Sequence, residues 1–296
     1  MNFMSNNITT TLTYVFLYLT VISLWIPQFK KIPLWGVLLV ASILLGLVSH
    51  RLDLIALVFI SLLATTTAWL GNPKTAILLR VVSAIVIFIL SIGFGMFFLP
   101  GFHNLQVLNN VHISTDGIPF NLYLNFDKTI VGVFIIGFLH QRLVTKNEWV
   151  IMAKAAIPRA IIVIFVVACL SFLFKFVWFD PKFPDSFFMW ACTNLLFVCL
   201  AEEAFFRGFM QKYLCMVLQR VKYGALIAIS LSSILFGLYH YAGGTRYMLL
   251  ATVAGLGYGW VYFRTQKIES SILTHFSLNL VHFLFFTYPA LATGLL

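Results

Sequence analysis

Charged side chains are scarce in this sequence: Asp, Glu, Lys and Arg make up 9% of 296 residues, whereas 61% are hydrophobic and the mean hydropathy is +0.98. Typical soluble domains carry about 25% charged residues. This composition excludes a soluble globule and predicts an all-α fold, a polytopic bundle of transmembrane helices. The net charge of +10 therefore indicates basic loops beside anionic lipid headgroups, and we expect no nucleic-acid partner.

Cysteines are also few. The four present have no CxxC spacing, which argues against both a disulfide framework and a zinc knuckle. The first apolar run has no basic residue before it and no small-residue cleavage site after it. It is therefore expected to be a retained span rather than a signal peptide.

Apolar runs recur along the whole chain. They fall at residues 8–26, 32–49, 52–70, 76–99, 129–139, 157–174, 187–209, 223–239, 247–263 and 271–288. A helix needs about 20 residues to cross a hydrocarbon core of ~30 Å, so the fifth run is short for a crossing. The sequence thus predicts about nine or ten spans.

The distribution of basic residues orients these runs. We assume that all ten runs cross the membrane and that the N-terminus lies outside. Of the 19 Lys and Arg residues, five then lie in outside loops, Arg207 lies within a span, and the other thirteen lie in the cytoplasm. The outside five are Arg51, Lys128, Lys175, Lys182 and Arg246. The positive-inside rule favours this orientation, with both termini outside.

The longest polar stretch, residues 100–128, contains several asparagines and the turn-like pair Asp116-Gly117. On this topology it lies outside. Loops of this length are uncommon and sometimes functional. We expect a long connection here rather than a gate for a substrate.

The stretch Leu200-Ala201-Glu202-Glu203-Ala204-Phe205-Phe206-Arg207 places two carboxylates and a guanidinium in an apolar run. Each ionised group costs roughly 2.5–3.5 kcal/mol at bilayer depth on insertion scales, so such groups face a cavity and mark a functional site or a structural ion pair. Residues four apart share a helix face, which predicts that Glu203 pairs with Arg207 while Glu202 points elsewhere. Glu202 is therefore the candidate general base.

Two later runs carry polar side chains at the same spacing. Phe236-Gly237-Leu238-Tyr239-His240 ends the eighth run, and His275 and Asn279 lie four apart in the tenth. Because each polar group is costly to expose to lipid, we expect Glu202, His240, His275 and Asn279 to line one polar cavity.

Depth raises a difficulty for this shared cavity. If the eighth run crosses the membrane from Tyr223, His240 lies near the face opposite to Glu202 and His275. His282 shares nearly the same face as His275 but lies deeper. We expect it to pack or to support the site rather than to take part in the chemistry.

Three short motifs follow one another along the chain: Glu202-Glu203-x-x-x-Arg207, Phe236-x-x-x-His240 and His275-x-x-x-Asn279. Together they resemble those of the CPBP family, the CAAX-processing and bacteriocin-processing or self-immunity membrane proteins also called the Abi family. The resemblance covers about residues 187–286. It implies a catalytic helical core at 186–296, with accessory transmembrane helices at 1–185.

The resemblance implies an intramembrane endopeptidase in the lipid bilayer, acting on a membrane-associated or lipid-modified peptide or protein. Glu202 and His240 would activate water, and His275 and Asn279 would stabilise the oxyanion. Glu203 and Arg207 would position the site. No cofactor is implied, and the expected location is the plasma (inner) membrane of a prokaryote.

Other functions stay open at this stage. Zinc held by Glu202, His240 and His275 would give a metalloprotease. HExxH is absent, however, and the sequence shows no carboxylate placed to orient either histidine.

A transporter would also bury charges, but its polar groups are usually spread over related halves, whereas these lie in the final third. A catalytically silent immunity protein is disfavoured because every motif residue is present. The GxSG and GxGD signatures of other intramembrane proteases are missing.

Overall fold

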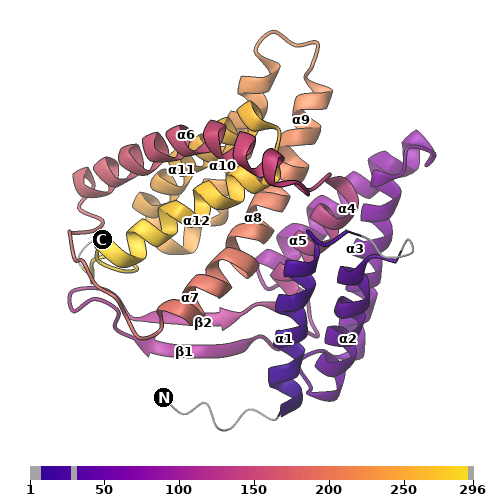
Figure 1. Ribbon diagram of the computed structural model, residues 1–296, viewed down its shortest axis with the longest axis horizontal. Helices are drawn as coiled ribbons and strands as arrows, with labels where there is room; N and C mark the ends of the chain where they lie inside the picture. Colours follow the sequence, from indigo (N-terminus) through magenta and orange to yellow (C-terminus); the bar gives the residue numbers. More distant parts are fainter. Residues whose placement is uncertain (1–7, 28–31, 293–296) are drawn as a thin grey trace. The chain divides into compact units, whose positions relative to one another are not determined.

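The structure, a computed structural model, describes residues 8–27 and 32–292. Lys30 and Lys31, counted above among the cytoplasmic residues, lie outside this part. The described chain is mostly helical, with one two-stranded sheet, isolated β-bridges and the connections between elements making up the rest (Figure 1). The predicted all-α class is confirmed.

The chain forms two compact units. The first contains Met1–Leu105, Tyr123–Val144 and Leu196–Ala201, and the second contains Gln106–Leu122, Thr145–Leu195 and Glu202–Leu296. All the motif residues lie in the second unit. That unit begins earlier in the chain than the core at 186–296 that the motifs delimit.

Five helices build the first unit: α1 (Ile8–Ser23), α2 (Leu34–Val48), α3 (Leu54–Gly71), α4 (Ile77–Gly95) and α5 (Phe126–Leu139). Helix α5 is short because it is internal, with Ile130, Val133 and Ile135 fully buried. Its length therefore need not match the thickness of a bilayer. Asn104 anchors its start by donating to both carboxylate oxygens of Asp127, at 3.0 and 3.1 Å.

The second unit is built around α6 (Lys146–Leu173), the long helix Phe187–Val217 without its residues Leu196–Ala201, α10 (Gly224–Tyr239), α11 (Gly244–Thr265) and α12 (Ile268–Phe285). The polar stretch before it contains a hairpin, β1 (Leu105–Val111) and β2 (Phe120–Leu124), where the sequence predicted only a connection. Leu108 and Leu122 of this hairpin pack into a buried cluster with Trp190 and Phe283.

Helix α6 begins eleven residues before the apolar run that predicted it. Thr145 and Glu148 form a capping box at its start, in which the Thr145 hydroxyl accepts from the Glu148 backbone N–H and the Glu148 carboxylate accepts from the Thr145 backbone N–H. Ile157, Ile161 and Phe165 recur along one face and are 56%, 62% and 68% exposed. An apolar stripe of this kind in a polytopic chain faces lipid.

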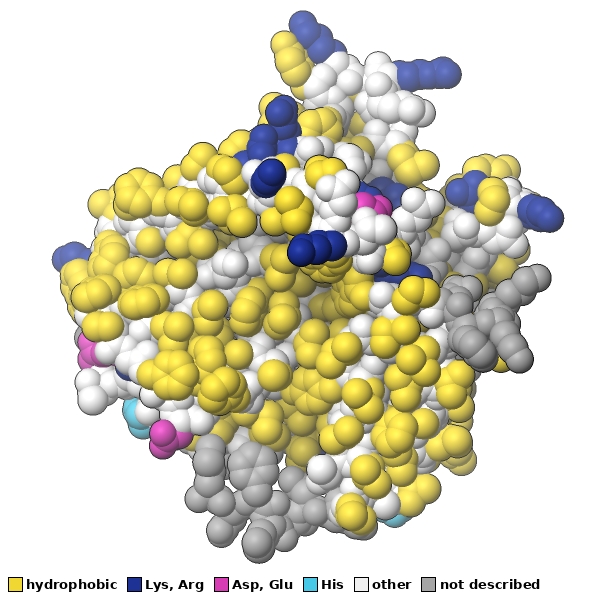
Figure 2. Space-filling view, viewed as in Figure 1, with side chains coloured by type: hydrophobic (Ala, Val, Ile, Leu, Met, Phe, Trp, Pro, Cys, Tyr) yellow, Lys and Arg dark blue, Asp and Glu magenta, His cyan; other side chains and the backbone are white. Residues whose placement is uncertain are grey.

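Each of the ten apolar runs falls on a described helix, but fewer helices have the length and composition of a membrane span. Four do: α3, α4, α6 and Phe187–Val217. The α10–α11 pair qualifies only as a fifth, bent element, and α1 and α2 are shorter apolar helices of 16 and 15 residues. Hydrophobic side chains cover most of the visible face in Figure 2. The chain is thus an integral multi-pass membrane protein, although length and composition support four or five spans rather than nine or ten.

Candidate active site

The first motif lies on the helix Phe187–Val217, which departs twice from α-helical geometry. It consists of α7 (Phe187–Thr193), a π segment η2 (Asn194–Cys199), α8 (Leu200–Glu203), a second π segment η3 (Ala204–Gln211) and α9 (Lys212–Val217). Glu202 and Glu203 thus occupy one short α-helical turn between two wider ones. Such π segments are rare and occur frequently at functional sites.

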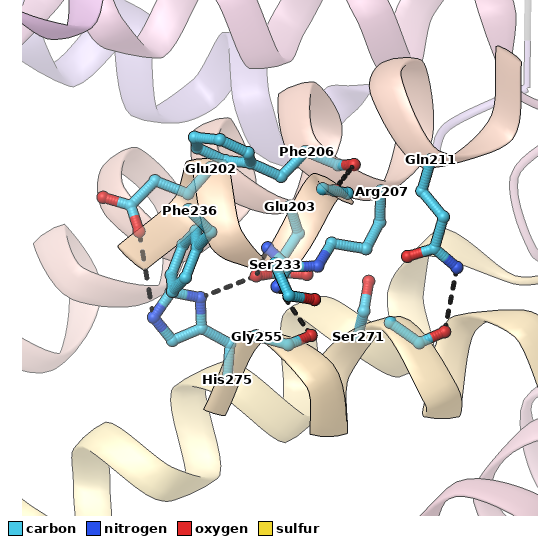
Figure 3. Close-up of polar contacts among 12 residues, drawn as sticks. Glu202, Glu203, Phe206, Arg207, Gln211, Ser233, Phe236, Gly255, Ser271 and His275 are labelled. Carbon is cyan, nitrogen blue, oxygen red and sulfur yellow. Dashed lines mark hydrogen bonds and ion pairs between the residues drawn. The ribbon is translucent and has the colours of Figure 1, made fainter. Parts of the chain in front are cut away.

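Glu203 and Arg207 form a fully buried ion pair. Arg207 Nη1 donates to Glu203 Oε1 at 3.2 Å, which confirms the predicted shared face. Arg207 Nη2 donates to the Gly255 carbonyl oxygen at 2.9 Å, and the guanidinium lies over the Phe236 ring, 4.5 Å from its centroid (Figure 3). The charges of the pair are therefore compensated by each other and by α11.

Glu203 also holds His275, a contact between residues 72 positions apart. His275 Nδ1 lies 2.9 Å from Glu203 Oε1 and donates to it, since a carboxylate oxygen accepts (Figure 3). The Tyr258 ring stacks on the imidazole at a centroid distance of 4.6 Å. The expectation that no carboxylate orients either histidine is therefore wrong: Glu203 fixes the ring of His275 and leaves Nε2 as the acceptor of the neutral form.

His240 follows the last residue of α10, at a short break after which the chain continues into α11. The α10–α11 pair is bent by 58° at this break. His240 Nδ1 donates to the Phe236 carbonyl oxygen at 2.7 Å, so Nε2 is again the acceptor of the neutral ring. The depth difficulty assumed that α10 crosses the membrane alone. As half of a broken element, α10 brings His240 to Glu202.

Glu202 completes a cluster of three acceptor atoms. Its Oε2 lies 3.8 Å from His240 Nε2 and 3.9 Å from His275 Nε2. These separations are longer than direct hydrogen bonds, and with both rings neutral all three atoms offer lone pairs. The cluster therefore suits a group that presents positive charge or protons to it, such as a water molecule.

A cavity of about 90 Å³ lies beside this cluster, among α6, α11 and α12. His240, His275 and Asn279 line it, whereas Glu202 is not part of the lining and lies 3.8 and 3.9 Å from the Nε2 atoms of the two lining histidines. Asn279 Nδ2 donates to Asn194 Oδ1 at 3.1 Å, which fixes the orientation of the Asn279 amide. The structure thus brings all four side chains of the expected cavity into one region.

Some residues that hold the site were missed from the sequence. Besides Asn194, Gln211 is buried and donates to the Gly259 carbonyl oxygen at 2.9 Å, and Ser232 donates to the Phe206 carbonyl oxygen at 2.7 Å. Asn194 and Gln211 are the two amide side chains of the helix Phe187–Val217, which carries Glu202. The sequence contains no signal for the partners that they bind.

The donor types at the site would suit zinc, because a carboxylate and two imidazoles with hydrogen-bonded Nδ1 atoms are common zinc ligands. Within the described part of the chain, however, no three His, Cys, Asp or Glu residues are grouped so that they could hold a metal ion. We therefore derive no step through a metal.

Residues 184–281 match the family model of the type II CAAX prenyl endopeptidases, Rce1-like. This region belongs to that family. The Rce1-like region contains all three motifs and most of the second unit's helices, and residues 1–183 lie outside it. No curated protein and no solved structure matches the chain. The match supports a CAAX-protease-like intramembrane endopeptidase, with the three motifs all inside the matched region.

Proposed function

We propose that this endopeptidase cleaves a C-terminally prenylated or otherwise membrane-anchored peptide, using water activated by Glu202 and His240. The convergence of Glu202 Oε2 with the Nε2 atoms of His240 and His275 supports the proposal most strongly. Glu202 Oε2 and His240 Nε2 can hold one water by accepting its two protons, and the carboxylate can then remove one of them.

Hydrolysis then follows from the roles of individual atoms. Glu202 accepts a proton as the water oxygen attacks the scissile carbonyl carbon, and that proton passes to the leaving amine nitrogen when the C–N bond breaks. The Asn279 amide donates to the developing oxyanion, and so does His275 when Nε2 carries a proton. Glu203 and Arg207 keep the His275 ring in place.

The experiment is cleavage of a farnesylated peptide by the purified protein in lipid vesicles, with the products identified by mass spectrometry. We expect one new peptide C-terminus at a single bond, at a rate that a strong chelator does not change. Loss of cleavage in chelator, with recovery on adding zinc, would replace the metal-free mechanism with the zinc alternative. No cleavage of this or any lipid-anchored peptide would remove the proposed substrate class.

We also propose that the protein lies in the inner membrane of a prokaryote with its N-terminus outside. This orientation follows from the 13-to-5 distribution of basic residues that ten crossings would give, a larger number of crossings than the four or five that helix length and composition support among the described residues. A cysteine introduced at exposed Asn109 in the β-hairpin should react with an impermeant thiol reagent in intact cells. Reaction only after lysis would reverse the topology.

A further inference from the structure

The cavity extends beyond the catalytic cluster along α12. Its α6 and α11 walls are mostly apolar, including Val167, Ala251 and Ala254, whereas α12 contributes polar side chains. A bound peptide backbone needs partners for its N–H and C=O groups when it leaves water. The α12 wall can supply several of them in a row, and Ser171, Tyr247 and Tyr258 add isolated polar groups on the other walls.

Three of these polar residues form one line. His275, Asn279 and His282 follow each other at spacings of four and three, so they share a face of α12, and all three line the cavity. Seven residues of helix advance about 10 Å at ~1.5 Å each. An extended peptide covers that distance in about three residues at ~3.3 Å each.

His282 is held in a defined orientation at the far end of this line. Its Nε2 lies 3.1 Å from the Thr287 carbonyl oxygen, which can only accept, so Nε2 carries the hydrogen and Nδ1 is the acceptor of the neutral ring. Thr287 is itself fixed, since its backbone N–H donates to the Trp178 carbonyl oxygen at 2.9 Å. The Tyr288 ring packs on the imidazole at a centroid distance of 5.1 Å.

We propose that His282 is a substrate-binding residue whose Nδ1 accepts a hydrogen bond from a backbone N–H of the extended substrate, about three residues from the scissile bond. Its occupant is thus a peptide backbone, with small or aliphatic side chains against the α6 and α11 walls. The proposal rests on the proposed endopeptidase activity. His282 lies one residue beyond the matched Rce1-like region, and none of the three motifs includes it.

His282→Gln is the informative variant. The glutamine amide N–H can replace Nε2–H as donor to Thr287, so folding is preserved, but the acceptor at the position of Nδ1 is lost. His282→Asn is the matched control, because its amide reaches the position of Nδ1 and retains an acceptor there. Thermal stability of both variants is measured beside cleavage.

The test combines these variants with a farnesylated peptide N-methylated at one backbone nitrogen at a time. In the wild type, N-methylation at the third residue from the cleaved bond should lower kcat/KM by about tenfold, the usual effect of one hydrogen bond. In His282→Gln the same methylation should have no further effect, and His282→Asn should regain sensitivity to it.

Equal effects of N-methylation in wild type and His282→Gln at every position would overturn the proposal, as would coupling only beside the cleaved bond. Failure of the wild type to cleave the unmodified peptide would instead overturn the proposed function, and this inference with it.

Discussion

Glu202→Gln is expected to lower kcat for peptide hydrolysis by about 10²–10⁴-fold while the protein folds and inserts normally. An amide has nearly the shape of the carboxylate but cannot take a proton from water. Glu202 Oε2 lies 3.8 and 3.9 Å from the Nε2 atoms of its two histidine neighbours and outside the Glu203–Arg207 ion pair, so the change leaves that ion pair in place.

The measurement compares initial cleavage rates with protein level and thermal stability. Asp185→Asn, the same change at an exposed carboxylate, is the matched control and should behave as the wild type. Loss of activity accompanied by loss of stability would mean that Glu202 is structural. Full activity in a well-folded Glu202→Gln protein would remove it as the base.

Arg207→Ala and Glu203→Gln are expected to lower the free energy of unfolding by roughly 3–5 kcal/mol, and protein level with it. Either change leaves one charge of a fully buried pair without its partner. Glu203→Gln additionally removes the carboxylate that holds His275, so activity should fall further than stability alone explains.

Two comparisons isolate the charge effect. Arg220→Ala removes an exposed cation from the turn after α9 and should change neither level nor stability. The double variant Glu203→Gln with Arg207→Met leaves no uncompensated charge, so it should recover much of the protein level of the single variants without recovering activity. A double variant as unstable as the sum of the two single changes would contradict this account of the pair.

Periodicity within one helix was a reliable guide to local geometry. The spacing of four between Glu203 and Arg207 predicted their ion pair, and the apolar runs predicted the helices, since both depend on residues close in the sequence. The start of α6 was missed because the charged residues Lys146, Glu148 and Lys154 interrupt the apolar pattern before residue 157. Only the capping pair Thr145 and Glu148 indicates where it begins.

Contacts between helices are not predicted by any comparable pattern in the sequence. The Glu203–His275 hydrogen bond joins separate helices, and no periodicity specifies which faces meet. The two π segments around Glu202 were not predicted from the sequence either. The break after His240 has a sequence signal, because the glycine pair Gly243-Gly244 lies at the end of the short turn that follows His240. The interpretation of residues 223–239 as a complete span left this glycine pair unused.

The central claim is that Glu202 and His240 act together on one water molecule, and a double-variant comparison tests it most directly. His240→Asn can keep the hydrogen bond to the Phe236 carbonyl while removing Nε2. The measured quantity is kcat/KM for the farnesylated peptide in Glu202→Gln, in His240→Asn and in both combined. Residues that act as a unit are non-additive, so the combined variant should be no slower than the slower single variant. A combined loss equal to the product of the two single losses would show that the residues act independently and would contradict the shared-water mechanism.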